Sequence, residues 1–262
     1  MMMRIAASLA YEGGAYCGWQ QQSHSPSIQE HVERALSQVA NHRMQTVCAG
    51  RTDTGVHASH QIIHFDTDAI RPLHAWVKGT NSYLPKDINL NWAVSVSNDF
   101  HARFSALSRR YRYMIYNGPV RLGLWQRQMT YCRYFLDENA MQEAAQYWLG
   151  EHDFSSFRAS GCQSNTPMRR IDEFTVQRQG NMVIFDVEAN AFLHHMIRNF
   201  AGVLMTIGSG NKAPVWAKEV LNSCDRRQAG VTAPASGLYF INVTYPDVFE
   251  LPAARIEPLI LI

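Results

Sequence analysis

Residues 49–60 read AGRTDTGVHASH and place one carboxylate, that of Asp53, in a turn with a glycine on either side. The apolar segment 46–49 precedes this turn, and residues 61–65 follow it with the apolar and aromatic side chains typical of a strand. We therefore expect Asp53 to lie on a loop held at both ends by strands. The two glycines permit backbone angles that other residues resist, so this loop can bring its carboxylate close to a ligand. The alternative is an ordinary turn residue that caps its own backbone.

The composition is that of a globular protein, with 46% hydrophobic and 18% charged residues in a chain of 262. No apolar run approaches the roughly 18 residues of a membrane span. The apolar start, residues 5–10, is too short for a signal sequence and soon meets Glu12. The five cysteines form no Cys-x-x-Cys pair, and their odd number favours free thiols over disulfides or a zinc site. The protein is therefore expected in the cytoplasm.

Arginine accounts for 20 of the 24 basic residues, although the formal net charge is only +2. Its guanidinium group forms a planar fork for phosphate and a face that stacks on bases. Residues 100–136 contain no acidic side chain, and aromatic residues are interleaved there with Arg103, Arg109, Arg110, Arg112, Arg121, Arg127 and Arg133. This strip favours a surface for a polyanion, because a merely solvated face usually mixes both signs. The alternative is a solvated strand face backed by core aromatics.

Hydrophobic periodicity predicts helices and strands along the whole chain. Ser27 and Glu30 form a capping box at the start of one helix, and Asp137 caps another that Gly150 ends. The predicted helices cover 27–41, 72–83, 137–149, 193–207 and 215–224. Besides the two strands around Asp53, the predicted strands cover 4–11, with one buried face, and 88–96, 109–117, 171–178, 182–189 and 238–245.

Both halves of the chain run in the order strand, helix, antiparallel strands. This order predicts an α+β fold made of two similar α/β units around antiparallel sheet. We place the domain boundary where the pattern lapses. The N-terminal domain, 1–104, carries the Asp53 loop, and the C-terminal domain, 105–262, carries the Arg/aromatic strand and the helix with Arg198. The apolar end, 251–262, is expected to pack on the body or on a second subunit.

Arg198 is a candidate partner for the carboxylate. It follows Ile197 on the buried stripe of the helix over 193–207, so it borders the core. An arginine is rarely buried unless it is paired. A pair with Asp53 would favour the ionised carboxylate in a partly dry pocket. The alternative is a boundary arginine whose charged end lies in water.

Five histidines invite a metal hypothesis: His57, His60, His64, His194 and His195. On an extended segment His57 and His60 point to opposite faces, and no carboxylate or cysteine is correctly spaced to complete the ligands of a metal. We therefore predict no metal site and interpret His64 as a strand histidine with a partner of its own. No phosphate-binding glycine loop and no Gly-x-Ser-x-Gly motif is present. The residues predict chemistry with one carboxylate, no cofactor and a polyanionic substrate.

Several motifs occur together in an order known from one family. They are Gly50–His57 (GRTDTGVH), Arg110–Tyr113 (RYRY), Asn190–Asn199 (NAFLHHMIRN) and Gly237–Tyr239 (GLY), together with Tyr16–Gln20 (YCGWQ) and Asp153–Arg158 (DFSSFR). In these motifs, and from about Arg4 to Pro252, the chain resembles the tRNA pseudouridine synthase A (TruA) family. Thr54 departs from the alanine that we expect more often at that position, but it is small and should not disturb the turn.

The resemblance implies the pseudouridine synthase fold and a cofactor-free isomerisation of uridine to pseudouridine at positions 38, 39 and 40 of the tRNA anticodon stem-loop. It implies that Asp53 is the catalytic carboxylate, either as a nucleophile at the sugar or in an initial deprotonation. Arg198 then pairs with Asp53, and Tyr111 stacks on the target uracil and helps the proton on carbon five to leave. The residues assigned to substrate binding are Tyr111, Arg51, Arg110, Arg112 and His57. A homodimer is implied as well.

Two other functions stay open at this point. A non-catalytic RNA-binding protein would need the basic strip but would tolerate Asp53→Asn. A metal-dependent hydrolase would need His57, His60 and His64 and would stop when a chelator is added. Neither explains why Asp53, Tyr111 and Arg198, far apart in the sequence, all match the motifs of one family.

Overall fold

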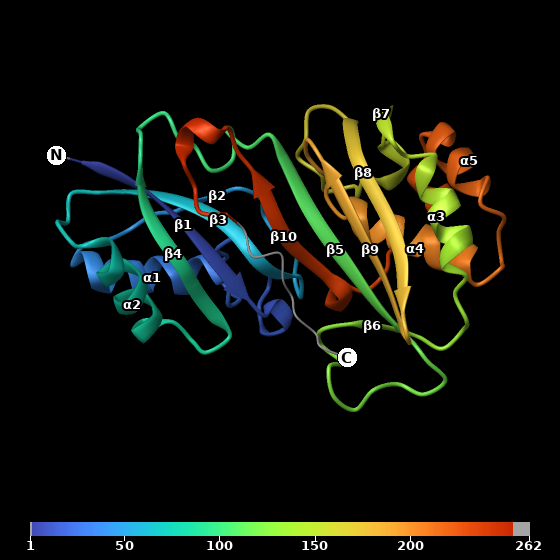
Figure 1. The fold of residues 1–262 in the computed structure, drawn as a ribbon, viewed down its shortest axis with the longest axis horizontal. Helices are drawn as coiled ribbons and strands as arrows, with labels where there is room; N and C mark the ends of the chain where they lie inside the picture. The colour runs from blue at the N-terminus through green and yellow to red at the C-terminus, as the bar shows by residue number, and fades with distance from the viewer. Residues whose placement is uncertain (1, 254–262) are drawn as a thin grey trace. The chain divides into compact units, whose positions relative to one another are not determined.

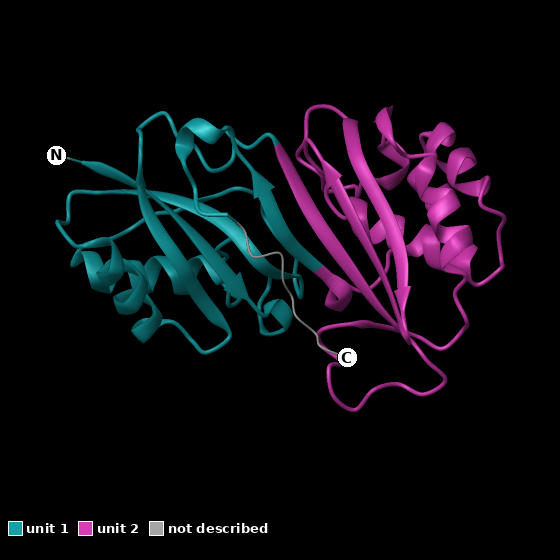
Figure 2. Ribbon diagram, viewed as in Figure 1, with its two compact units in different colours: residues 1–107, 239–262 teal, residues 108–238 magenta. Residues whose placement is uncertain are grey.

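The computed structural model describes residues 2–253, which form two compact units (Figure 2). Unit 1 comprises Met1–Leu107 and the C-terminal segment that starts at Tyr239, and unit 2 comprises Ser108–Leu238. The fold is α+β, as the sequence predicts, with mostly antiparallel strands. The chain leaves unit 1 close to the expected boundary at residue 104, but its last strand returns to unit 1 instead of staying with the second half.

Unit 1 is built on a sheet with β1 (Met3–Tyr11) in its interior (Figure 1). β1 pairs antiparallel with β3 (His57–Thr67) on one side and with β4 (Ile88–Val96) on the other. β2 (Val47–Cys48) pairs with β3, and β10 (Leu238–Thr244) lies parallel to the start of β3. This parallel pairing, which sets Tyr239 opposite His57, draws the last strand into unit 1.

β1 is buried on both faces, whereas its alternating pattern predicted one buried face. Ile5, Ala7 and Leu9 are 0% exposed on one face, and Ala6 and Ser8 are 0% exposed on the other. Small side chains on the second face hide this burial from a reading of the sequence, because alanine and serine do not mark a strand as apolar. The expectation of a half-buried strand was therefore wrong.

Two helices complete the main part of unit 1. α1 (Ile28–Ala40) and α2 (Leu73–Tyr83) pack against each other, and α2 also packs against β4. Ser27 caps α1 as predicted, because its Oγ accepts a hydrogen bond of 3.3 Å from the backbone N–H of Glu30. Asn41, in the left-handed region with φ of 61°, ends the helix.

The sheet of unit 2 follows the order β5, β9, β8, β7, with β6 paired to β5 (Figure 1). These strands are β5 (Ser108–Asn117), β6 (Thr130–Cys132), β7 (Gly150–Asp153), β8 (Met168–Gln179) and β9 (Met182–Ala189). All pairs are antiparallel except that of β5 and β6. The helices are α3 (Glu138–Gln146), α4 (Met196–Gly208) and α5 (Trp216–Ser223).

An aromatic core joins these helices to their sheet. The ring of Phe200 on α4 stacks on Trp148, with centroids 4.5 Å apart, and contacts Phe174 of β8 at 5.7 Å. On the same side of the sheet, Tyr113 of β5 stacks on Phe185 of β9 at 5.2 Å. α4 is therefore anchored firmly to the strands, which matters because it carries Arg198.

Some element bounds differ from those predicted. α4 begins at Met196 rather than near residue 193, because His195 has a φ of 61° and cannot continue a helix backwards. Gln179 pairs with Met182, so the β8–β9 loop has two residues instead of three. The short strands β6 and β7 were not predicted. Most of the apolar end, 251–262, lies outside the described residues.

Candidate functional site

Asp53 lies on the loop between β2 and β3 in unit 1, as the sequence predicts. Its side chain is half-buried. The backbone N–H of Val56 donates to the carbonyl oxygen of Asp53 at 3.1 Å, and Gly55 has a φ of 80°, so a tight turn follows the aspartate. The carboxylate thus projects from a short loop with defined backbone geometry.

The segment Tyr16–Gln20 packs against this loop and forms hydrogen bonds with its backbone. The N–H of Trp19 donates to the carbonyl of Thr52 at 3.0 Å, and the N–H of Gly55 donates to the carbonyl of Tyr16 at 3.3 Å. Gly18, with φ of 86°, lies so close that a Cβ there would be 2.6 Å from the Thr52 oxygen. Sequence reasoning assigned this segment no role. The pair Gly18-Trp19, in a loop that follows a buried strand, could have indicated a close contact of this loop with another backbone segment.

Side chains from β1 and β3 fix the start of the loop. The amide of Gln61 brackets Gly50, since it accepts from the N–H at 3.4 Å and donates to the carbonyl at 2.5 Å. The hydroxyl of Tyr11 lies 2.9 Å from Oγ1 of Thr52. Burial raises the pKa of Tyr11 far above its usual value, so the phenol stays neutral. Asp53 is therefore held by contacts on both sides of the loop.

Arg51 and His57 flank Asp53 in very different environments. Arg51 is exposed. His57 is only 1% exposed, its Nδ1 accepts a hydrogen bond of 3.0 Å from the N–H of Gly13, and its ring stacks on Tyr239 at 4.7 Å. This burial disfavours a direct contact between His57 and a substrate, and favours a role in holding the turn.

The other two histidines of β3 have separate partners. Nδ1 of His60 lies 3.0 Å from Oγ of Ser8, and Nδ1 of His64 accepts from the N–H of Ala102 at 3.1 Å. Burial lowers the pKa of each to about 4, so both are neutral at neutral pH. Among residues 2–253, His57, His60 and His64 do not gather as ligands of one metal. The metal-dependent hydrolase therefore loses its proposed site.

Tyr111 lies in unit 2 on β5 and is 8% exposed. Its ring meets Phe192 edge to face, with centroids 5.0 Å apart and an interplanar angle of 79°. Phe192 belongs to the motif that leads into α4. One contact thus links the strand of the RYRY motif to the segment that precedes Arg198.

Arg198 occupies the first turn of α4 and is half-buried, as its place beside the buried stripe predicts. Its Nε donates to the carbonyl of Ala233 at 2.9 Å, and the N–H of Ala233 donates back to the carbonyl of Arg198 at 3.0 Å. Two reciprocal hydrogen bonds therefore fix the guanidinium group relative to its own helix. The pair of Arg198 with Asp53 stays a prediction.

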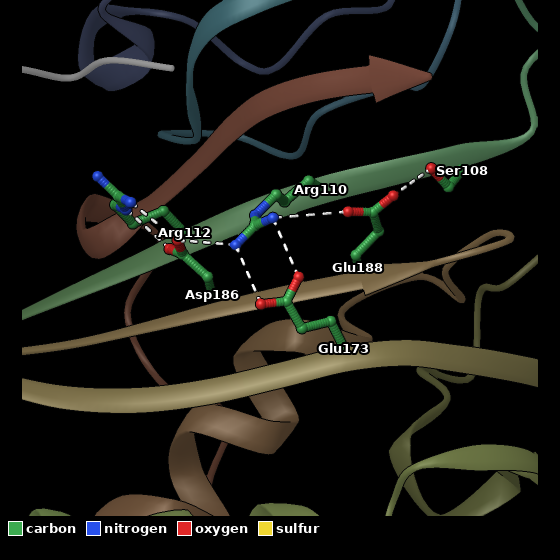
Figure 3. Close-up of polar contacts among 6 residues, drawn as sticks. All are labelled: Ser108, Arg110, Arg112, Glu173, Asp186 and Glu188. Carbon is green, nitrogen blue, oxygen red and sulfur yellow. Dashed lines mark hydrogen bonds and ion pairs between the residues drawn. The ribbon is translucent and has the colours of Figure 1, made fainter. Parts of the chain in front are cut away.

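Arg110 and Arg112 face carboxylates on the neighbouring strands, as Figure 3 shows. Nε of Arg112 lies 2.7 Å from Asp186 of β9. Arg110 lies 3.1 Å from Glu173, 3.5 Å from Asp186 and 3.7 Å from Glu188. These ion pairs form a network across β5, β9 and β8. Three carboxylates thus surround two guanidinium groups. This charge balance disfavours a direct contact with phosphate, and substrate binding by Arg110 and Arg112 stays a prediction.

The other end of the basic strip is more open. Between residues 119 and 135 most side chains are exposed, including Trp125 (51%), Tyr134 (59%) and Phe135 (72%). The guanidinium of Arg133 lies over the ring of Tyr134 at 4.6 Å. Within the described residues, neither Arg121 nor Arg133 forms an ion pair with a carboxylate. We call residues 119–135 the basic-aromatic loop.

Comparisons with known proteins agree over almost the whole chain. A family model described as tRNA pseudouridine synthase matches residues 7–105 and 144–246. A tRNA pseudouridine synthase A of Coxiella burnetii is 54% identical over 260 residues, which cover 99% of this chain and 100% of that protein. One of Colwellia psychrerythraea is 51% identical over 259 residues, covering 99% and 100%.

Similarity to solved structures is much weaker. A crystal structure of the archaeal box H/ACA sRNP Nop10-Cbf5 complex matches 77% of this chain and 43% of that chain at 11% identity. Its TM-score is 0.37, which is too low to support a conclusion.

Within residues 2–253, no helix combines the length and apolar character needed to cross a membrane.

Proposed function

This chain belongs to the tRNA pseudouridine synthase family, and we propose that it isomerises uridine to pseudouridine at positions 38, 39 and 40 in the anticodon stem-loop of tRNA. The observation that carries the proposal is the similarity to tRNA pseudouridine synthases A over 99% of the chain. The fixed loop that presents Asp53 adds independent support. The proposed activity makes the protein an isomerase that needs no cofactor.

The reaction breaks the bond from ribose to uracil nitrogen one, turns the base, and joins ribose to carbon five. The hydrogen on carbon five leaves as a proton, and nitrogen one gains a proton, so atoms and charge balance. A base inside a stem cannot turn in place and must first leave the stack. Asp53 is the proposed catalytic carboxylate, either as a nucleophile at ribose or as the base of an initial deprotonation.

Preorganisation of the loop supports this role for Asp53. The backbone contacts of Tyr16 and Trp19 fix the residues on either side of the aspartate before any substrate binds. A reacting group that is already oriented does not lose conformational freedom in the transition state. The same contacts make a loop used only as a surface turn less plausible.

Arg198 is the proposed partner of Asp53. The planar guanidinium fork suits a carboxylate, and the bond from Nε to Ala233 holds its plane. We expect Arg198→Ala to reduce turnover strongly. A thermal melt of the same variant separates a loss of chemistry from a loss of folding.

Tyr111 and Arg51 are the proposed contacts to the extruded nucleotide. The ring of Tyr111 is held by β5 and by Phe192, so it offers a fixed face on which uracil stacks. Arg51 is exposed two residues before Asp53, where its guanidinium suits a phosphate of the flipped nucleotide.

The basic-aromatic loop is proposed as a contact to the tRNA outside the target base. Its arginines suit phosphates, and its exposed aromatic side chains suit unstacked bases.

We further propose that the protein works as a homodimer in the cytoplasm. Sedimentation equilibrium should then give twice the chain mass of 29.8 kDa; a single chain mass at micromolar concentration would refute the dimer.

The position claim is tested by mapping pseudouridine in defined tRNA transcripts. Carbodiimide adducts on pseudouridine stop reverse transcription, so the modified positions appear as stops. We expect stops at 38, 39 and 40 wherever uridine stands there, and none after each is replaced by cytidine. Stops elsewhere in the tRNA would contradict the proposed positions while leaving the isomerase activity intact.

A further inference from the structure

A segment of unit 2 crosses the start of α4 and contacts it repeatedly. This segment, Arg226–Gly237, contains two short 3-10 helices, η3 (Arg226–Ala229) and η4 (Ala235–Gly237), and we call it the strap. Ala233 of the strap forms the reciprocal hydrogen bonds with Arg198 described above. The strap therefore binds Arg198 through its Nε and its backbone carbonyl.

Asn199, the next residue on α4, joins the strap to the helix. Its side chain is 0% exposed, and its Oδ1 accepts from Nη2 of Arg226 at 2.9 Å and from Oγ1 of Thr232 at 2.7 Å. Its Nδ2 donates to the carbonyl of Phe157 at 2.7 Å. One buried amide thus ties together α4, the strap and the segment after β7.

The strap is also fixed at two further points. The hydroxyl of Tyr113 donates to the carbonyl of Pro234 at 2.8 Å. Gly202 lies one turn after Arg198 on α4, and a Cβ there would be 1.9 Å from the carbonyl oxygen of Val231. The backbone of the strap therefore rests directly on the helix, and its distance from Arg198 is set by hydrogen bonds on both sides of Ala233.

We infer that Asn199 and Thr232 are positioning residues for Arg198: they hold the strap in the register in which Ala233 orients the guanidinium group. This inference rests on the role proposed for Arg198 and names residues that act through it. Thr232 has no other evident task, since its hydroxyl donates to Asn199 and accepts from Arg226 at 2.7 Å. A displacement of the strap by a fraction of an ångström would turn the fork of Arg198 away from its acceptor.

The test compares Thr232→Val with Thr232→Ser in single-turnover assays on tRNA labelled with tritium at uracil carbon five. Valine keeps the shape of threonine and removes the hydroxyl, whereas serine keeps the hydroxyl. We expect Thr232→Val to slow tritium release about tenfold with tRNA affinity unchanged within about twofold, and Thr232→Ser to keep the wild-type rate. Equal rates for all three proteins would overturn the inference.

A matched control lies on the same helix. Thr206 donates its hydroxyl to the carbonyl of Gly202 at 2.8 Å, within its own helix, and among the described residues no hydrogen bond of its side chain reaches the strap. Thr206→Val therefore removes a hydroxyl from α4 without disturbing Arg198, and it should turn over at the wild-type rate. A similar slowing in both valine variants would assign the effect to the stability of α4 and contradict the inference.

A double-mutant cycle separates positioning from a general loss of structure. Thr232→Val should slow the residual rate of Arg198→Ala by less than about twofold, because no guanidinium is left to orient. A further tenfold loss in that background would overturn the inference alone. A wild-type rate in Arg198→Ala by itself would instead remove the proposed role of Arg198, and the inference with it. Asn199→Leu, which removes both acceptor contacts to the strap together with the donor to Phe157, should slow tritium release at least as much as Thr232→Val.

Discussion

Tyr111 combines two properties that one substitution separates. In the proposed reaction its ring stacks on uracil, and its hydroxyl helps the proton on carbon five to leave. We predict that Tyr111→Phe binds tRNA normally but turns over at least about tenfold more slowly, whereas Tyr111→Ala also binds more weakly. Filter binding and tritium release measure the two effects. Normal turnover in Tyr111→Phe would mean that only the ring matters.

His60 gives the folded protein a specific dependence on pH. Burial lowers its pKa from 6.5 to about 4 in the folded state, while the unfolded chain takes up the proton near pH 6.5. The unfolded state therefore binds more protons between these values, so the free energy of unfolding falls as pH decreases from 6.5 towards 4. The stabilisation from His60 is fully present above pH 6.5 and amounts to about 3 kcal/mol at most.

We predict that His60→Gln flattens this pH dependence. Urea unfolding of wild type and variant at pH 7, 6, 5 and 4.5 measures it, and exposed His24 offers the control variant His24→Gln. The difference in unfolding free energy between wild type and His60→Gln should shrink as the pH is lowered. A difference that stays constant over this range would show that His60 does not titrate as the structure implies.

At the scale of elements, the basic strip divides into two parts with different tasks. On β5 Arg110 and Arg112 pair with carboxylates across the sheet, and the pKa of Arg112 is raised chiefly through its hydrogen bond to Asp186. In the basic-aromatic loop Arg121 and Arg133 are exposed. A phosphate contact contributes about one unit to the salt dependence of RNA binding, and a structural ion pair contributes nothing to it.

We therefore predict that Arg121→Ala and Arg133→Ala each reduce the slope of log K against log salt by about one. Arg112→Ala should leave that slope unchanged and lower the free energy of unfolding by about 1–3 kcal/mol, because Asp186 loses its main partner. Arg227, whose side chain is 88% exposed beside Asp225, supplies the control: Arg227→Ala should leave both the salt slope and the free energy of unfolding nearly unchanged. A reduced slope in Arg112→Ala would restore β5 as an RNA contact.

Elements were predictable where the signal was local. The Ser27 cap, the strand over 109–117 and the strands around Asp53 all depend on neighbours in the sequence, and all are confirmed. The acids that neutralise Arg110 lie far away in the chain, so a count of charges along residues 100–136 missed them. Long-range pairing, not local propensity, decides which arginines remain open.

At the scale of the whole molecule, the α+β fold predicted from the sequence is confirmed and the assigned site residues stay predictions, but the sequence did not reveal how the chain closes on itself. The last strand returns to unit 1 through a parallel pair with β3 that no local pattern announces. The strap over α4 was missed for the same reason, since its contacts with Asn199 depend on a register set by tertiary packing. The family motifs singled out Asp53, Tyr111 and Arg198 without such information, because a motif marks a position even when its spatial partners are unknown.

We propose that Asp53 carries out a metal-free isomerisation of tRNA uridine, and tritium release tests this proposal most directly. Pseudouridine has the mass of uridine, but its formation must expel the hydrogen from carbon five. With tRNA transcript labelled there and a chelator present, wild type should release tritium. Asp53→Asn should fold and bind tRNA but release it on the order of 10³-fold more slowly. Release at the wild-type rate by Asp53→Asn, or no release by either protein despite tight tRNA binding, would contradict the claim.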